Sequence, residues 1–349
     1  MHFSVVIPLY NKQNSIVATL QSVLAQTYQN FEILVVDDGS TDNSAQVVQE
    51  LICEVKGKRL EVKGEDNGKA ETSASTPSGV PDKVRDFVGC SYTLHSTPSI
   101  RLIHKPNAGV CSARNRGIQE AKYDYIALLD GDDLWDKHYL EEQVKLIQDF
   151  PEAKMWGINF AEMSNGKLIR TLPTGLPEGY RGYVENYFQI PGRVSDLYCS
   201  SSVVIKKEVF DRVGYFDERI KYAEDSDMWF RIIATYPVAF YDKYMAFYLY
   251  DAENRAMNRT RLLKHFLPYY VDKYQNFKHN AVFYRWINRW ASNFIRAYYF
   301  DPSKDQLEDA RIAASKLDYA VIPPKYKLLY KAPYWIAVIL NKLDKWYHR

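Results

Sequence analysis

The sequence predicts an α/β protein with an open, mostly parallel sheet flanked by helices, followed by a helical C-terminal appendage. Three observations indicate this fold class. Short apolar runs are typical of strands buried on both faces, amphipathic segments of helical spacing separate them, and acidic residues directly follow two of the runs. Strands and helices that alternate through short loops are the pattern of a doubly wound sheet, in which ligands bind outside the carboxyl ends of the strands.

The alternation begins almost at the first residue. Pro8 cannot donate a backbone hydrogen bond, so we expect it to end the first strand. The helix that follows carries Ile16, Leu20 and Val23 at helical spacing. Strands are predicted at residues 3–8, 31–36, 100–103, 125–129, 154–160, 167–172 and 199–205, and helices at 14–26, 43–52, between 107 and 121, from 136 to 150, around 210, and from 224 to 233.

We predict two domains and one insertion. Residues 1–250 form the main α/β domain, and residues 251–349 form the helical appendage. Within the first domain, residues 53–99 lose the periodic pattern and are rich in small and polar residues. Such a composition is typical of a low-complexity insertion rather than a folded module.

Composition excludes several classes of protein. The chain has 349 residues, 46% of them hydrophobic and 25% charged, with a formal net charge of +2. This near-neutral charge argues against a general nucleic-acid binder. The 4 cysteines are scattered, which argues against a disulfide scaffold or a zinc site and fits a reducing compartment. The N-terminus does not resemble a signal peptide, and no window approaches the roughly 20 apolar residues of a membrane span. We therefore expect a cytoplasmic protein.

Three carboxylates, Asp130, Asp132 and Asp133, follow the buried run at 125–129, with Gly131 providing backbone freedom for the turn. Like charges this close repel one another unless a cation or hydrogen-bond donors compensate them. Oxygen ligands favour a hard divalent metal, Mg²⁺ or Mn²⁺. The alternative is a solvated acidic turn before a helix, with Asp133 or Asp136 as the helix cap.

A second strand end is also acidic, because Asp37 and Asp38 follow the run at 31–36. Acids at equivalent ends of neighbouring strands indicate one shared pocket. In nucleotide-binding α/β folds, an acid after the second strand binds ribose hydroxyls. The alternative for one of the two acids is an Asx-turn with a helix cap.

A third candidate segment begins at Asn107 and leads into a helix. Gly109 near the helix start permits close approach of a ligand, and a helix N-terminus favours an anion. Arg114 and Arg116 can then contact a diphosphate, or they can simply pair with the aspartates.

Five segments in this order resemble family 2 glycosyltransferases of the GT-A fold over about residues 1–250. They are Val5-Val-Ile-Pro-Leu-Tyr-Asn11, Val35-Val-Asp-Asp-Gly-Ser-Thr-Asp42, the loop and helix from Asn107 to Gly117, Asp130-Gly-Asp-Asp133, and Glu224-Asp225. The resemblance implies a nucleotide-diphosphate sugar donor, usually a UDP-sugar, and inversion at the anomeric carbon.

The resemblance also implies roles for single residues. Pro8, Tyr10 and Asp38 would line the uracil and ribose site. The D-x-D pattern of the family falls on Asp130 and Asp132, so Asp132 would hold Mn²⁺ or Mg²⁺ against the phosphates, and Asp130 would contact the ribose or the metal.

The same resemblance places the catalytic base on Asp225, with Glu224 as its supporting neighbour. The expected activity is an inverting transfer of a hexosyl or N-acetylhexosaminyl group from a UDP-sugar to a saccharide or lipid-linked acceptor in surface-polysaccharide biosynthesis. A non-catalytic sugar-nucleotide-binding or scaffold protein is the alternative, since a fold alone does not give function. A nucleotidyltransferase would need a glycine-rich loop after the first strand, and an oxidoreductase would need G-x-G-x-x-G; neither is present.

The appendage allows two interpretations. Its aromatic residues can pack against the catalytic domain or a second subunit, which would give a homo-oligomer. Alternatively, the basic and aromatic segment 326–349 forms a surface that binds the inner face of the plasma membrane peripherally, where lipid-linked acceptors lie.

Overall fold

The computed structural model describes residues 1–62, 98–164, 167–170, 175–190, 197–253, 273–299, 304–336 and 338–339. They belong to two compact units. The first comprises Met1–Glu218 and Met228–Asn258, and the second comprises Arg219–Asp227 and Arg259–Arg349. Residues 63–97 of the expected insertion and residues 340–349 of the expected membrane-binding segment lie outside the described residues.

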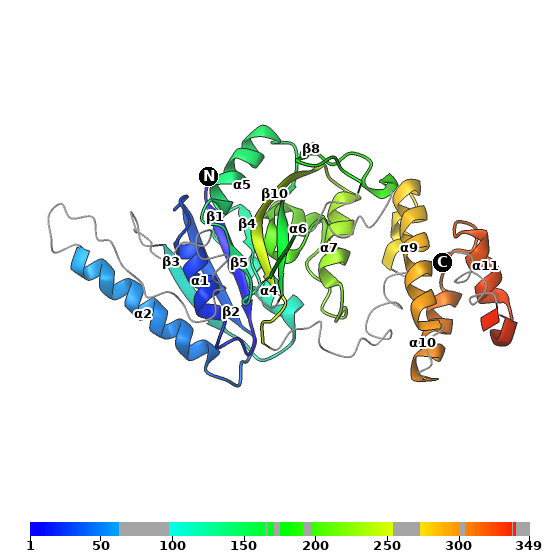
Figure 1. Cartoon of the computed structure of the whole chain (residues 1–349), viewed down its shortest axis with the longest axis horizontal. Helices are drawn as coiled ribbons and strands as arrows, with labels where there is room; N and C mark the ends of the chain where they lie inside the picture. Colours follow the sequence, from blue (N-terminus) through cyan, green and yellow to red (C-terminus); the bar gives the residue numbers. More distant parts are fainter. Residues whose placement is uncertain are drawn as a thin grey trace. The chain divides into compact units, whose positions relative to one another are not determined.

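The first unit contains the predicted parallel sheet (Figure 1). Four neighbouring strands run parallel to one another: β3 (Ser99–His104), β2 (Phe31–Asp37), β1 (Phe3–Leu9) and β4 (Tyr125–Leu128). Because β1 lies between β2 and β4, the two acidic strand ends flank the end of β1 on the same edge of the sheet.

Beyond β4 the sheet becomes mixed. β9 (Val203–Lys206) pairs antiparallel with both β4 and β6 (Met155–Ser164), and β6 pairs parallel with β10 (Val238–Leu249). The short strands β5 (Leu134–Trp135), β7 (Lys167–Arg170) and β8 (Arg181–Tyr183) complete the described sheet, all in antiparallel pairs.

Helices cover both faces of the sheet, and the alternation of side chains along β1 shows why. Phe3, Val5 and Ile7 pack in one core with α1 (Ile16–Leu24), α2 (Ser44–Val62) and α5 (Tyr139–Asp149). Val6 points to the other face, where it packs with α4 (Val110–Glu120), α6 (Glu208–Val213) and Met228 and Trp229 of α7 (Glu224–Ile233). A strand buried on both faces is a nearly continuous apolar run, as the sequence predicted.

Pro8 does not end the first strand, because β1 continues to Leu9. Val6 accepts a hydrogen bond from Leu129 of the β4 segment, and Leu9 accepts one from Asp38 on the β2 side. Backbone groups alternate along a strand. The backbone of Pro8 therefore faces the β4 side. The last residue of β1 that pairs with β4 is Val6, so Pro8 lies beyond the paired region. The missing N–H of Pro8 costs the sheet no hydrogen bond there.

Other element boundaries also differ from the prediction. α2 runs to Val62 instead of ending near Ile52. The predicted strand at 199–205 begins with a 3-10 turn at Ser200–Ser202, and β9 starts only at Val203. β5, β8 and β10 were not predicted. β10 is half-buried in its middle, so its sequence lacks the continuous apolar run that identified the other strands.

The described part of the second unit is helical, which confirms the predicted appendage. It includes α9 (Ala281–Tyr299), α10 (Lys304–Ser315) and α11 (Pro324–Lys331). Phe283, Ile287 and Ile295 of α9 are buried. None of the helices in the described ranges combines the length and the apolarity needed to cross a lipid bilayer.

Candidate functional site

Asp38 holds two loops of the candidate site together. Its carboxylate is only 4% exposed and forms an ion pair with Lys105. Its two oxygens accept hydrogen bonds from the backbone N–H groups of Ala108 at 3.0 Å and Gly109 at 2.7 Å. Its backbone carbonyl accepts a further hydrogen bond from Nδ2 of Asn107 at 2.8 Å. Asp38 thus fixes the segment that begins α4, and its predicted contact with a ribose stays a prediction.

Asp37 is buried next to Asp38 and binds different partners. Its Oδ1 accepts the backbone N–H of Ser40 at 3.0 Å, which is the Asx-turn that the sequence allowed for one of these acids. Its Oδ2 lies 3.0 Å from Nδ1 of His104, at the end of β3. Asp37 therefore ties the end of β2 to the end of β3.

Asp130 and Arg114 form an ion pair, with Nη2 of Arg114 2.7 Å from Oδ1 of Asp130. Arg114 is 3% exposed and lies over the ring of Phe216, whereas Asp130 is 27% exposed. Arg116 points elsewhere and pairs with Glu120, one turn along α4. Of the two arginines, then, only Arg114 compensates the acidic strand end.

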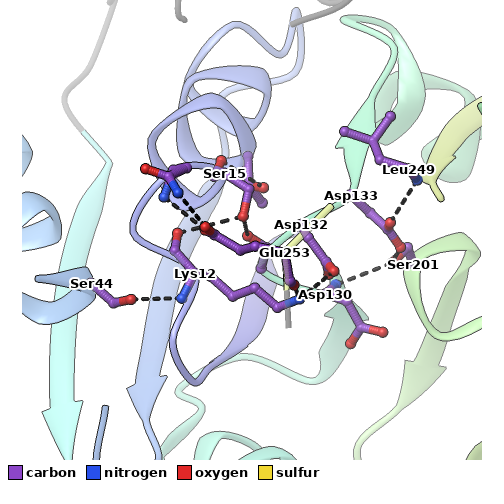
Figure 2. Close-up of polar contacts among 12 residues, drawn as sticks. Lys12, Ser15, Ser44, Asp130, Asp132, Asp133, Ser201, Leu249 and Glu253 are labelled. Carbon is purple, nitrogen blue, oxygen red and sulfur yellow. Dashed lines mark hydrogen bonds and ion pairs between the residues drawn. The ribbon is translucent and has the colours of Figure 1, made fainter. Parts of the chain in front are cut away.

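Asp132 pairs with a basic residue from the end of another strand. Nζ of Lys12 lies 2.6 Å from Oδ2 of Asp132 (Figure 2). Lys12 comes from the loop after β1, so the contact joins two strand ends that are 120 positions apart in the chain. The side chains of Lys12 and Asp132 are 11% and 14% exposed.

Asp133 is a structural residue and differs from its two acidic neighbours. It is 1% exposed, and its carboxylate accepts hydrogen bonds from Ser201 Oγ at 2.5 Å and from the backbone N–H of Leu249 at 3.2 Å. Burial, followed by the negative charges of Asp132 and Asp130, raises the pKa of Asp133 well above its usual range. Asp133 thus joins the end of β4 to β10.

The predicted helix cap after the acidic turn is not formed by Asp133 or Asp136. His138 occupies the position before α5, and Asp136 accepts the backbone N–H of His138 at 2.8 Å. The role of Gly131 also differs from the prediction. Gly131 does not adopt a positive φ, so the turn does not depend on the backbone freedom of glycine. A Cβ at Gly131 would lie 3.0 Å from the carbonyl oxygen of Pro8, so glycine allows the acidic turn to approach β1 closely.

Pro8 and Tyr10 are both half-buried at the end of β1. The residue after Tyr10, Asn11, adopts a left-handed conformation with φ of 52°. Its Oδ1 accepts the backbone N–H of Thr41 at 2.8 Å, and its Nδ2 donates to the hydroxyl of Thr41 at 3.2 Å. These bonds hold the loops after β1 and β2 together, and they fix the backbone that carries Tyr10.

Glu224 and Asp225 begin α7, as predicted, and both side chains are half-buried. Oδ1 of Asp225 accepts the backbone N–H of Ser226 at 2.6 Å. These two acids belong to the second compact unit, whereas the acids after β2 and β4 belong to the first.

Asp227 anchors the first turn of α7. It is fully buried and contacts the hydroxyl of Tyr274 at 2.7 Å and Nζ of Lys273 at 2.8 Å. The three residues all lie in the second compact unit. A fully buried carboxylate with these partners has a structural role, and α7 therefore retains Glu224 and Asp225 as its candidate functional acids.

The donor set at the end of β4 fits a divalent cation of the Mg²⁺ type. Asp130 and Asp132 offer carboxylate oxygens, and their negative charges add to burial in raising the pKa of the neighbouring Asp133. No group of three or more His, Cys, Asp or Glu among the described residues could hold a metal. Mg²⁺ is commonly bound by one or two carboxylates together with substrate phosphates and water, so two aspartates suffice.

Several residues around the acids were not selected from the sequence. A basic or polar residue within a few positions of a buried strand end is a usable signal, and it applies to Lys12, His104 and Lys105. It applies to Asn11 as well, whereas no local signal identifies Ser201, Leu249 and Glu253, because they come from distant segments. The residues concerned are Asn11, Lys12, His104, Lys105, Ser201, Leu249 and Glu253.

The architecture places the chain in the class of open α/β proteins whose ligands bind at the carboxyl edge of the sheet. The model of the family described as "Glycosyl transferase family 2" matches residues 4–72 and 77–214. These residues are more than half of the chain, which therefore belongs to glycosyl transferase family 2.

Individual relatives agree with this assignment. An uncharacterized glycosyltransferase of Rickettsia felis is 30% identical over 244 residues, which cover 69% of this chain and 31% of that protein. The amylovoran biosynthesis glycosyltransferase AmsB of Erwinia amylovora is 26% identical over 233 residues, which cover 66% of this chain and 63% of AmsB. The chain spans less than a third of the length of three of the curated relatives that it matches.

Among solved structures, the chain is similar to the crystal structure of S. aureus TarS in complex with UDP-GlcNAc. The TM-score is 0.67 and the sequence identity 16%, and the match covers 95% of this chain and 86% of the TarS chain. This likeness confirms the predicted GT-A fold.

Proposed function

We propose that this protein is an inverting glycosyltransferase that moves a sugar from a UDP-sugar to a saccharide or lipid-linked acceptor in surface-polysaccharide assembly. The main support is that Asp37 and Asp38 at the end of β2, and Asp130 and Asp132 after β4, lie on either side of β1 at the same edge of the sheet. Membership of glycosyl transferase family 2 gives the reaction class. The complex of TarS with UDP-GlcNAc supports the choice of donor, and the name of AmsB, an amylovoran biosynthesis glycosyltransferase, supports the pathway.

The chemistry assigns a separate task to each group. Attack at the anomeric carbon by the acceptor oxygen breaks the bond between the sugar and the diphosphate, and the diphosphate leaves with the bonding electrons. We assign removal of the acceptor hydroxyl proton to the carboxylate of Asp225, with Glu224 as its neighbour. Asp132 and Asp130 would hold Mn²⁺ or Mg²⁺, which when bound neutralises charge on the leaving diphosphate. A leaving group stabilised in this way needs no protonating acid.

The test is a panel of UDP- and GDP-sugars with and without Mn²⁺. We expect one UDP-sugar to raise the Tm by about 5 °C in the presence of metal, when the ligand is about 100-fold above its Kd, and much less without metal. Addition of the acceptor should then release UDP. Stabilisation without UDP release across a broad acceptor panel would favour the non-catalytic alternative, and the absence of any nucleotide effect would contradict the donor assignment.

We also propose that the second unit binds the inner face of the plasma membrane peripherally. Leu328, Trp335 and Ile339 are exposed by 60%, 66% and 50%, and exposed Lys325 and Lys331 lie on the same helix as Leu328. Apolar side chains next to lysines complement an anionic bilayer surface, because the apolar groups insert while the ammonium groups meet the lipid phosphates.

Replacing both Leu328 and Trp335 with Ser should lower co-sedimentation with vesicles of phosphatidylglycerol and phosphatidylcholine several-fold. The matched control is Ile312→Ser, since Ile312 is 44% exposed on α10 of the same unit. The control should sediment as the unsubstituted protein does. Equal sedimentation of the double variant and the control would contradict the membrane assignment.

A further inference from the structure

The ammonium of Lys12 lies at the carboxylate that is expected to bind the metal. Nζ of Lys12 is 2.6 Å from Oδ2 of Asp132 and also donates to the backbone carbonyl of Glu253, in the segment after β10 (Figure 2). Both acceptors belong to the first compact unit. The ammonium therefore has two oxygen partners, and both contacts are partly buried.

The backbone of Lys12 is fixed independently of these contacts. Its N–H donates to the hydroxyl of Ser44 at 2.7 Å, and Ser44 in turn donates its N–H to Asp42 at 2.9 Å. The carbonyl of Lys12 accepts the N–H groups of Ser15 at 3.1 Å and Ile16 at 3.0 Å, at the start of α1. The backbone of Lys12 is therefore held at both its N–H and its carbonyl. The fold thus sets the position from which the Lys12 side chain reaches Asp132.

Glu253 stays attached to the same loop by bonds that do not involve the ammonium. Its carboxylate accepts the backbone N–H of Asn14 at 2.7 Å and a hydrogen bond from Nδ2 of Asn14. The Lys12 side chain can thus leave its position without freeing the segment that carries Glu253. Another cation can consequently replace the Lys12 ammonium at Asp132.

We propose that Lys12 is the resident counter-ion of Asp132, and that a divalent metal binds only by displacing its ammonium. This proposal rests on the metal site of the proposed function. A metal ion and an ammonium group repel each other, so they do not share one partly buried carboxylate favourably. Metal alone leaves the displaced ammonium without an anionic partner. A diphosphate supplies that partner, so Lys12 couples metal binding to diphosphate binding. By linkage, each ligand then strengthens the binding of the other equally.

The experiment measures the Kd of Mn²⁺ by electron paramagnetic resonance of the free ion, with and without UDP. In the unsubstituted protein, UDP should strengthen Mn²⁺ binding about tenfold or more, within the usual range of coupling between two ligands. Lys12→Met should bind Mn²⁺ alone about tenfold more tightly, and the strengthening by UDP should shrink correspondingly. Lys12→Arg, which keeps the charge, should bind Mn²⁺ alone as weakly as the unsubstituted protein.

Two further variants make the result specific. Lys145→Met is the matched control, because Lys145 is 48% exposed on α5 and pairs only with Glu141 and Glu142 among the described residues, and it should change neither Kd. Lys12→Gln keeps hydrogen-bond donors without charge and replaces Lys12→Met if the latter does not fold. Thermal unfolding of each variant without metal confirms that it is folded.

The outcomes separate this inference from the proposed function. If Asp132→Asn abolishes Mn²⁺ binding but Lys12→Met and Lys12→Gln bind Mn²⁺ equally or more weakly than the unsubstituted protein, Lys12 is not the displaced counter-ion although the metal site stands. If Asp132→Asn binds Mn²⁺ as tightly as the unsubstituted protein does, both the inference and the metal site are wrong.

Discussion

Replacing Asp225 with Asn should lower kcat for sugar transfer by about 10²–10⁴-fold, which is the usual contribution of a general base. The amide cannot take the proton from the acceptor hydroxyl. The fold of the helix start should survive, because the amide oxygen can still accept the backbone N–H of Ser226 that Asp225 accepts at 2.6 Å. We therefore expect the Kd of the UDP-sugar to change by less than about threefold, since general-base catalysis acts on the transition state and not on donor binding.

The measurement is UDP release under saturating donor and acceptor, together with calorimetric titration of the donor. Asp211→Asn is the matched control, because Asp211 is an exposed acid in the first turn of α6 and has no assigned role. It should retain full turnover. Residual turnover of Asp225→Asn within about tenfold of the unsubstituted protein would exclude Asp225 as the base.

Replacing Asp38 with Asn should lower the free energy of unfolding by about 2–4 kcal/mol, as expected when one partner of a buried, hydrogen-bonded charge pair is removed. Both carboxylate oxygens of Asp38 accept backbone N–H groups, from Ala108 and Gly109. An amide presents its own NH₂ group to one of these donors and leaves the Lys105 ammonium without its counter-charge. Donor affinity should fall as well, because the start of α4 loses its anchor.

Denaturant unfolding at neutral pH measures this effect. Asp124→Asn carries the same substitution at a carboxylate that is 76% exposed and 3.4 Å from Lys206, so its free energy of unfolding should change by less than about 0.5 kcal/mol. A loss below about 1 kcal/mol for Asp38→Asn would mean that the carboxylate is not the anchor of the loop. In that case the predicted contact of the Asp38 carboxylate with the ribose would explain why an aspartate occupies this position.

The parallel half of the fold and the positions of the candidate acids were predictable from the sequence. A strand buried on both faces is a nearly continuous apolar run, and this made β1, β2 and β4 recognisable without tertiary information. The acids at the ends of β2 and β4 had to lie at the carboxyl edge of the sheet. Half-buried strands carry no such run. This is why β10, which pairs with β6 at the other end of the sheet, was missed.

Local sequence could not rank the three acids after β4, because their roles depend on partners far along the chain. Asp130 meets Arg114, Asp132 meets Lys12 from the loop after β1, and Asp133 is buried between Ser201 and Leu249. The sequence by itself determined that a cluster of carboxylates lies at the end of a buried strand, because hydrophobic periodicity and chain direction are local properties. Only the tertiary structure decided which carboxylate is enclosed and which are compensated by cations, because burial and Coulomb interactions depend on distances in space.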